Sequence, residues 1–78
     1  MNTDFLRGSW EQIRGRIKSE WGKLTEDDLT RANGDLDELV GIIRKRYGYE
    51  DDAARAKVDE WLTKAEEKIR SLDGGKNA

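Results

Sequence analysis

The apolar residues near the start of the chain recur at helical spacing, and this feature constrains the fold more than any other. They step by three or four positions and are Leu6, Trp10, Ile13, Ile17 and Trp21. At about 100° per residue, this spacing keeps all of them on one side of a helix. Asn2 or Thr3 can cap its start, and Gly22 is a natural stop. The pattern predicts one amphipathic helix that must bury its apolar side.

Capping residues predict where the next two helices begin. Thr25 can accept a hydrogen bond from the amide of Asp28 while the Asp28 carboxylate reaches back, an arrangement known as the capping box. The Asn33-Gly34 pair predicts the end of that short helix and a turn. Asp35 then caps a third helix. The apolar stripe of this third helix consists of Leu36, Leu39, Val40, Ile43 and Tyr47.

A fourth and longest helix is expected after Gly48, which fits the left-handed residue that ends the third. Acidic residues 50–52 place negative charge on its first turn. Its apolar face consists of Ala54, Val58, Trp61, Leu62, Ala65, Ile69 and Leu72. Acid-before-base pairs four residues apart are expected on its solvent side at Asp51–Arg55, Glu60–Lys64 and Glu66–Arg70.

Together these patterns predict an all-α fold, a compact bundle of four short helices arranged as angled helical hairpins. The absence of proline agrees, since no position forbids a helix. One domain is expected over residues 3–72, with its core concentrated in the three tryptophans. Residues 73–78 have no apolar anchor and are predicted to form a flexible, disordered tail.

Composition excludes several classes of function. The chain carries 15 basic and 17 acidic residues, a net charge of -2, which is typical of a solvated surface and argues against nucleic acid as a partner. It has no cysteine and no histidine, which excludes disulfides and cysteine metal sites and removes the commonest metal ligand and neutral-pH base. We therefore expect no cofactor, no bound metal and no enzymatic activity.

The sequence also gives expectations about location and assembly. The start of the chain lacks a basic-then-apolar signal segment, and no apolar run approaches the ~20 residues that cross a bilayer. A cytoplasmic protein without a transmembrane segment is expected. Its oligomeric state is predicted as a monomer or a weak homo-oligomer.

The run Trp21-Gly22-Lys23-Leu24-Thr25-Glu26-Asp27-Asp28-Leu29 resembles the signature of the CsbD-like family of small bacterial general stress-response proteins. A second block is similar to that family in order and spacing, with Leu39-Val40-Gly41-Ile42-Ile43, Tyr47-Gly48-Tyr49, Ala54, Val58-Asp59 and Trp61. The resemblance covers about residues 5–64. It implies a bacterial cytoplasmic protein whose abundance rises under stress, and it brings no catalytic residues.

Glycines on the first predicted helix form one candidate site. Gly8, Gly15 and Gly22 recur every seven residues on the side opposite the apolar stripe. Gly22 is explained as a terminator, whereas an interior glycine costs about 1 kcal/mol relative to alanine. Gly8 and Gly15 are therefore a candidate partner surface, a seam where another helix of this chain or of a partner approaches closely. The alternative is simple flexibility.

A second candidate is a basic patch for phosphate or anionic lipid. Its residues are Arg14, Arg16, Lys18, Arg44, Lys45 and Arg46. The alternative is a solvated basic face near the negative end of the third helix. The tryptophans could similarly stack on bases, but their place on apolar stripes favours the core. Acidic clusters at residues 26–28 and 50–52 are explained by helix starts better than by a metal.

The function predicted from the sequence is therefore that of a non-enzymatic bacterial stress-response protein. It is expected to act through contacts with an unidentified protein partner or as an abundant hydrophilic protectant. The alternative is a module that binds anions, on nucleic acid or a membrane surface, through the basic patch.

Overall fold

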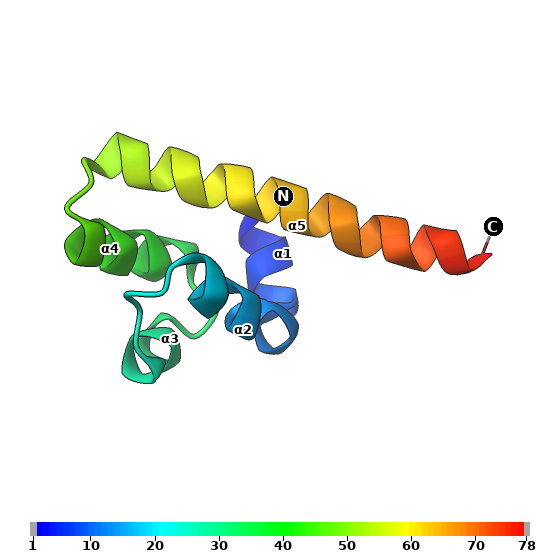
Figure 1. Cartoon of the computed structure of the whole chain (residues 1–78), viewed down its shortest axis with the longest axis horizontal. Coiled ribbons are helices and arrows are strands. Elements are labelled where there is room, and N and C mark those ends of the chain that lie inside the picture. The colour runs from blue at the N-terminus through cyan, green and yellow to red at the C-terminus, as the bar shows by residue number, and fades with distance from the viewer. Residues whose placement is uncertain (1, 78) are drawn as a thin grey trace.

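The computed structural model describes the backbone of residues 2–77 and the side chains of residues 2–71. It contains α1 (Asn2–Gly8), α2 (Trp10–Glu20), α3 (Glu26–Ala32), α4 (Leu36–Tyr47) and α5 (Asp51–Asn77). Residues 2–77 contain no strand, so the all-α prediction is confirmed. In Figure 1, α5 spans the molecule, α4 lies along its first half, and α1 meets its middle.

The first predicted helix is two helices in the structure, which raises the number from four to five. Ser9 separates α1 from α2 with φ -110° and ψ 11°. Gly8 and Ser9 are both weaker helix formers than alanine, so a break there costs little. The break turns α1 toward α4 and α5, where Leu6 is fully buried.

The predicted caps at Thr25 and Asp35 and the turn at Asn33-Gly34 are confirmed, whereas Asn2 and Thr3, predicted to cap the first helix, lie inside α1. Thr25 and Asp28 form both hydrogen bonds of the capping box, and the Asp35 side chain accepts from the amide of Glu38 at 3.0 Å. Gly34 has φ +84°, and a Cβ there would lie 3.4 Å from both the Cα of Arg7 and the Cβ of Trp10. Glycine is thus required at this turn by its backbone conformation and by the closeness of α1 and α2.

The apolar stripes meet in one core, as predicted. Trp10 and Trp21 are each only 5% exposed, whereas Trp61 is half-buried against that core. The rings of Trp21 and Trp61 meet edge to face, with centroids 5.6 Å apart. Ile42, which the predicted stripe omits, is also buried, and Leu72 lies outside the described side chains.

The last helix differs from the prediction in two ways. Of the three expected ion pairs along it, only Glu66–Arg70 forms, at 3.1 Å, and Arg55 instead reaches Asp37 on α4 at 3.1 Å. α5 also continues to Asn77, through most of the segment predicted as a disordered tail. No proline lies in this segment, so no residue there sterically stops the helix.

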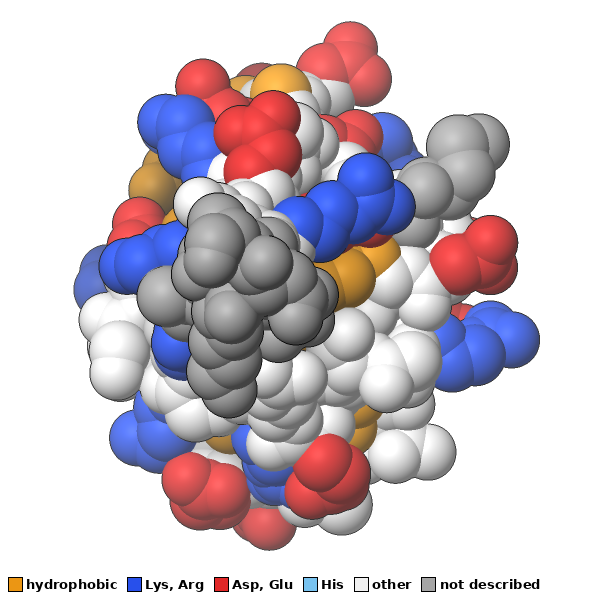
Figure 2. Space-filling view, turned by 90° about the vertical axis from the view of Figure 1, so that its right-hand side faces the viewer, with side chains coloured by type: hydrophobic (Ala, Val, Ile, Leu, Met, Phe, Trp, Pro, Cys, Tyr) orange, Lys and Arg blue, Asp and Glu red, His pale blue; other side chains and the backbone are white. Residues whose placement is uncertain are grey.

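The surface of the molecule is highly charged. Figure 2 shows one end, where basic and acidic side chains are interspersed and little apolar surface is exposed. None of the helices in the described part of the chain is long and apolar enough to span a membrane.

Candidate functional site

Among the side chains of residues 2–71, the buried charged one is that of Asp28, at the start of α3, which is 2% exposed. Its carboxylate oxygen Oδ2 accepts a hydrogen bond from the amide of Thr25 at 3.0 Å. In return, the amide of Asp28 donates to the Thr25 hydroxyl at 3.0 Å. The local capping pattern therefore fixes the carboxylate in place and aims it toward α4.

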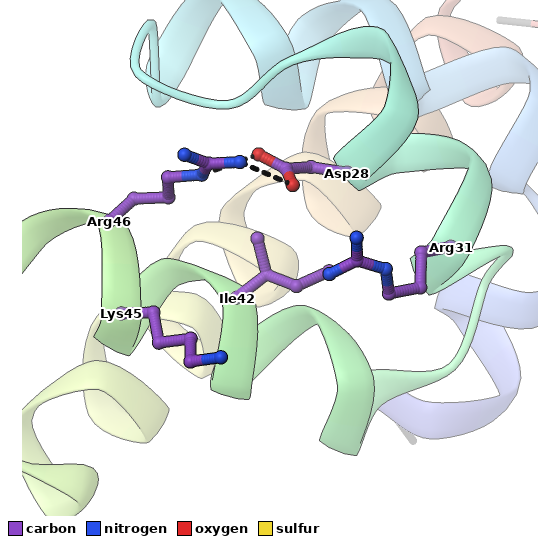
Figure 3. A pocket seen from close by; sticks show the side chains of 5 residues that line it. All are labelled: Asp28, Arg31, Ile42, Lys45 and Arg46. Atoms are coloured by element: carbon purple, nitrogen blue, oxygen red, sulfur yellow. Dashed lines mark hydrogen bonds and ion pairs between the residues drawn. The ribbon is translucent and has the colours of Figure 1, made fainter.

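Arg46, in the last turn of α4, completes this arrangement. Its Nε donates to Oδ2 of Asp28 at 2.7 Å and its Nη2 donates to Oδ1 at 2.9 Å, a two-pronged contact (Figure 3). These hydrogen bonds from Arg46 outweigh the effect of burial and lower the pKa of Asp28 to about 2. The carboxylate is therefore ionised near neutral pH, and the pair joins α3 to α4.

Beside this pair lies a cleft of about 400 Å³, which we call the α3–α4 cleft. Its lining residues are Asp28, Arg31, Ile42, Lys45 and Arg46. Figure 3 shows Arg31 of α3 reaching toward Ile42, with Lys45 on the same helix as Ile42. Neither Arg31 nor Lys45 forms an ion pair with any described side chain. The cleft thus holds three cations against one carboxylate, and that carboxylate already has a partner.

A smaller depression of about 240 Å³ adjoins the cleft and shares Arg31, Ile42 and Lys45 with it. It adds Arg44 together with the acidic side chains Asp37 and Glu38. Asp37 is already paired with Arg55, so Glu38 is the acidic neighbour of the cleft that has no ion-pair partner among residues 2–71.

The predicted basic patch is divided between several surfaces. Lys45 and Arg46 line the α3–α4 cleft, and Arg44 lines the adjoining depression. Arg14 pairs with Glu26 at 3.4 Å and lies over the Trp10 ring, 5.9 Å from its centroid. Arg16 lines a separate groove between α2 and α5. Lys18 lines neither the cleft nor the groove.

Sequence reasoning missed Arg31 and the partner of Asp28. Arg31 lies three residues after Asp28, so the two share a face of α3, and this spacing was a usable signal. The basic patch includes Arg46, but no local signal indicated it as the partner of Asp28, because it is 18 residues away and on another helix.

The candidate partner surface at Gly8 and Gly15 is open in this chain. Apart from the adjacent residues and the surrounding turns of the helix backbone, no atom lies within 4 Å of the position that a Cβ would occupy at either glycine. Both glycines are exposed, so no other helix of the described chain packs closely on them. A seam for a separate partner remains a prediction.

Comparison with known protein families finds a match over most of the chain. A family model described as CsbD-like matches residues 4–56, more than half of the chain. The chain belongs to the CsbD-like family. This match confirms the resemblance that the blocks beginning at Trp21 and Leu39 indicate. Stress response is the general role of this family.

Bacterial relatives match over most of their own length. The UPF0337 protein YjbJ of Escherichia coli O6:H1 is 51% identical over 61 residues, which cover 78% of this chain and 88% of the relative. A UPF0337 protein of Pectobacterium atrosepticum is 52% identical over 61 residues, with the same coverage of 78% and 88%. A UPF0337 protein of Bordetella pertussis is 42% identical over 62 residues, covering 80% and 94%. No solved structure matches the chain.

Proposed function

We propose that this member of the CsbD-like family acts in the stress response without catalysis, by binding an acidic segment of a protein partner at the α3–α4 cleft. One observation carries the proposal: Arg31 and Lys45 face the cleft without an ion-pair partner among residues 2–71, beside an Arg46 that is held in place. An acidic segment would supply the charges that these side chains lack.

The cleft has the chemistry to recognise carboxylates. The guanidinium of Arg31 can grip a carboxylate with two parallel hydrogen bonds, and Lys45 adds a compact positive charge. Arg46 uses Nε and Nη2 for Asp28, and Nη1 donates no hydrogen bond within the described chain. Ile42 gives the cleft an apolar surface for the methylene groups of a glutamate. Two carboxylates on neighbouring turns of a partner would match this set of groups.

The titration behaviour of Asp28 supports binding over catalysis. A general base needs a pKa near the working pH and a free lone pair aimed at a substrate. Asp28 has a pKa lowered to about 2 and accepts hydrogen bonds from Thr25 and Arg46. We infer that its role is to hold Arg46 and the two helices.

A nuclear magnetic resonance titration with a glutamate-rich decapeptide tests the proposal. The wild type is expected to show amide shifts centred on Arg31, Ile42 and Lys45 that weaken as salt rises. The double variant Arg31→Gln/Lys45→Gln should lose these shifts. A matched variant, Lys64→Gln/Lys68→Gln, removes the same charge elsewhere and should keep them.

Two outcomes would contradict this function. Equal loss of the shifts in both double variants would mean that the peptide responds only to total charge. Absence of localised shifts even at low salt would favour a protectant that needs no specific site.

A further inference from the structure

A second cationic surface lies between α2 and α5, on residues that the α3–α4 cleft does not use. This groove has a volume of about 500 Å³. It is lined by Arg16, Ser19, Glu20, Trp61, Lys64, Ala65 and Lys68. Arg16, Lys64 and Lys68 form no ion pair with any described side chain. Trp61 is half-buried, so part of its ring is open to this groove.

The groove continues into a second depression of about 390 Å³, which shares Glu20, Trp61 and Lys64 with it. The second depression is also lined by Trp21, Tyr47, Tyr49, Lys57 and Glu60. The Nζ of Lys57 lies 5.2 Å from the Tyr49 ring centroid, and the rings of Tyr47 and Tyr49 are stacked 5.5 Å apart. We call the two depressions together the Trp61 track.

The Trp61 track is positive in a chain whose total charge is negative. Its lining contains four cations, Arg16, Lys57, Lys64 and Lys68, against Glu20 and Glu60. Charges act mainly within about 8 Å at physiological salt, so a ligand in the track senses this local excess. The balanced composition argues against nucleic acid as a partner only if the charges are spread evenly over the surface. In the track they are not, because cations exceed acidic residues there.

The lysines of α5 follow the track lengthwise. Lys57, Lys64 and Lys68 are separated by steps of seven and four, which keep them on one side of the helix. At about 1.5 Å per residue, they span roughly 16 Å along the axis. That length exceeds a single nucleotide and suits a short segment of strand.

We propose that the Trp61 track binds single-stranded nucleic acid, with a base stacked on the open part of Trp61 and phosphates paired with Arg16, Lys64 and Lys68. Proteins that bind single strands combine a positive groove with aromatic side chains in this way. A duplex keeps its bases stacked inside and cannot offer one to Trp61. The inference is independent of the function proposed for the α3–α4 cleft.

The shape of the track favours a strand over an anionic membrane. A bilayer presents a broad surface, whereas the cations here surround two hollows. Membrane-surface helices bury a continuous apolar face of large residues. The α2–α5 groove offers only the partly buried Trp61 and the small Ala65 as apolar contacts, and the second depression adds aromatic rings but no aliphatic side chain.

Fluorescence anisotropy of a labelled thymidine dodecamer, measured across a range of salt, tests the inference. Three phosphate contacts predict a slope of about -2 for log affinity against log salt. Lys64→Gln/Lys68→Gln should reduce that slope by about 1.4. Trp61→Leu should weaken binding roughly 5- to 100-fold and leave the slope unchanged.

Arg31→Gln/Lys45→Gln is the matched control, because it removes the same charge from the α3–α4 cleft. It should leave dodecamer binding unchanged although it abolishes binding of the acidic peptide, so the two proposals fail separately. Since Trp61→Leu can weaken the core, circular dichroism must show a folded variant. Arg16 is exposed, and Arg16→Gln is a further test. It is expected to reduce the slope of log affinity against log salt by about 0.7.

Four results would overturn the inference. They are equal loss in the control double variant, equal binding of an abasic strand of the same length, equal affinity for thymidine monophosphate, and binding to vesicles containing phosphatidylglycerol without binding to the dodecamer. Each result would show that binding does not require the track, a base or a single strand.

Discussion

The α3–α4 cleft and the Trp61 track are both cationic, but their charges have different relations to the fold. In the cleft, Arg46 is tied to the buried Asp28 by two hydrogen bonds, and the pair joins two helices. In the track, Arg16, Lys64 and Lys68 have no ion-pair partner among residues 2–71, so none of them holds helices together through an ion pair. Arg46 thus serves the fold, whereas the cations of the track, like Arg31 and Lys45 beside Arg46 in the cleft, have no ion-pair partner among residues 2–71 and remain available for binding.

Removal of the Asp28 carboxylate should have the largest effect. Asp28→Ala breaks the capping box and leaves Arg46 without its partner, so the free energy of unfolding should fall by about 2–3 kcal/mol. Urea denaturation measures this change. The neighbouring exposed Asp27→Ala is the control, expected to stay within about 0.5 kcal/mol. Equal losses would show that Asp28 acts only through its charge near the helix start.

Acid should weaken the same region through the pKa of Asp28. Folding lowers this pKa from 3.8 to about 2, so the ionised group stabilises the fold above the unfolded value and loses that effect as pH falls through the folded one. Because solvent reaches Arg46 and screens the pair, we expect a loss of roughly 1–2 kcal/mol between pH 4 and pH 2. Denaturation curves across that range measure it. Asp28→Asn should lack this portion of the pH dependence, and an unchanged profile would contradict the assignment.

Gly15 lies on α2 between Arg14 and Arg16. Its substitution tests whether this side of the molecule contacts a partner or a second copy of the chain. Open space surrounds the position of a Cβ there, so Gly15→Ala should raise the free energy of unfolding by up to about 1 kcal/mol. Thermal denaturation and sedimentation measure stability and association. A variant that is more stable but no longer self-associates or binds a partner would make Gly15 a seam. Stability gained with association unchanged would mark it as a flexible position.

The smallest effect on stability is expected in the Trp61 track. Lys64→Gln/Lys68→Gln should change the free energy of unfolding by less than about 0.5 kcal/mol, because surface charges without partners add little. The measurement is again urea denaturation. A loss as large as that of Asp28→Ala would mean that these lysines are part of the fold, and the contrast between the two surfaces would disappear.

Local signals predicted the helices well, and long-range contacts explain what they missed. The capping box at Thr25 and the turn at Gly34 depend on neighbours in the chain, so the sequence was enough to find them. Gly8 and Ser9 make a break between α1 and α2 cheap, but the packing of α1 against α4 and α5 that accompanies the break has no local signal. The Asp28–Arg46 pair likewise joins residues 18 positions apart.

The basic patch was divided for a geometric reason. Consecutive helical residues are about 100° apart, so Arg44, Lys45 and Arg46 cannot all face one ligand. Arg14 and Arg16 differ by about 200° and point to different surfaces for the same reason. Sequence spacing does not show which helices meet, so it groups Arg14 and Arg16 with Arg44 and omits Arg31, which shares the cleft with Lys45 and Arg46.

The contact between the two ends of the chain has a consequence for synthesis. The first helix rests on the last one, where the Asn2 side chain donates to the carbonyl of Asp59 at 3.1 Å and Leu6 is fully buried. Chains emerge from the ribosome from the N-terminus onward, so the side of α1 that faces α5 stays uncovered until residues near Asp59 are made. The core therefore closes only once most of the protein has left the exit tunnel, and a shortened product that ends before α5 would lack the part of the cover over α1 and Leu6 that α5 provides.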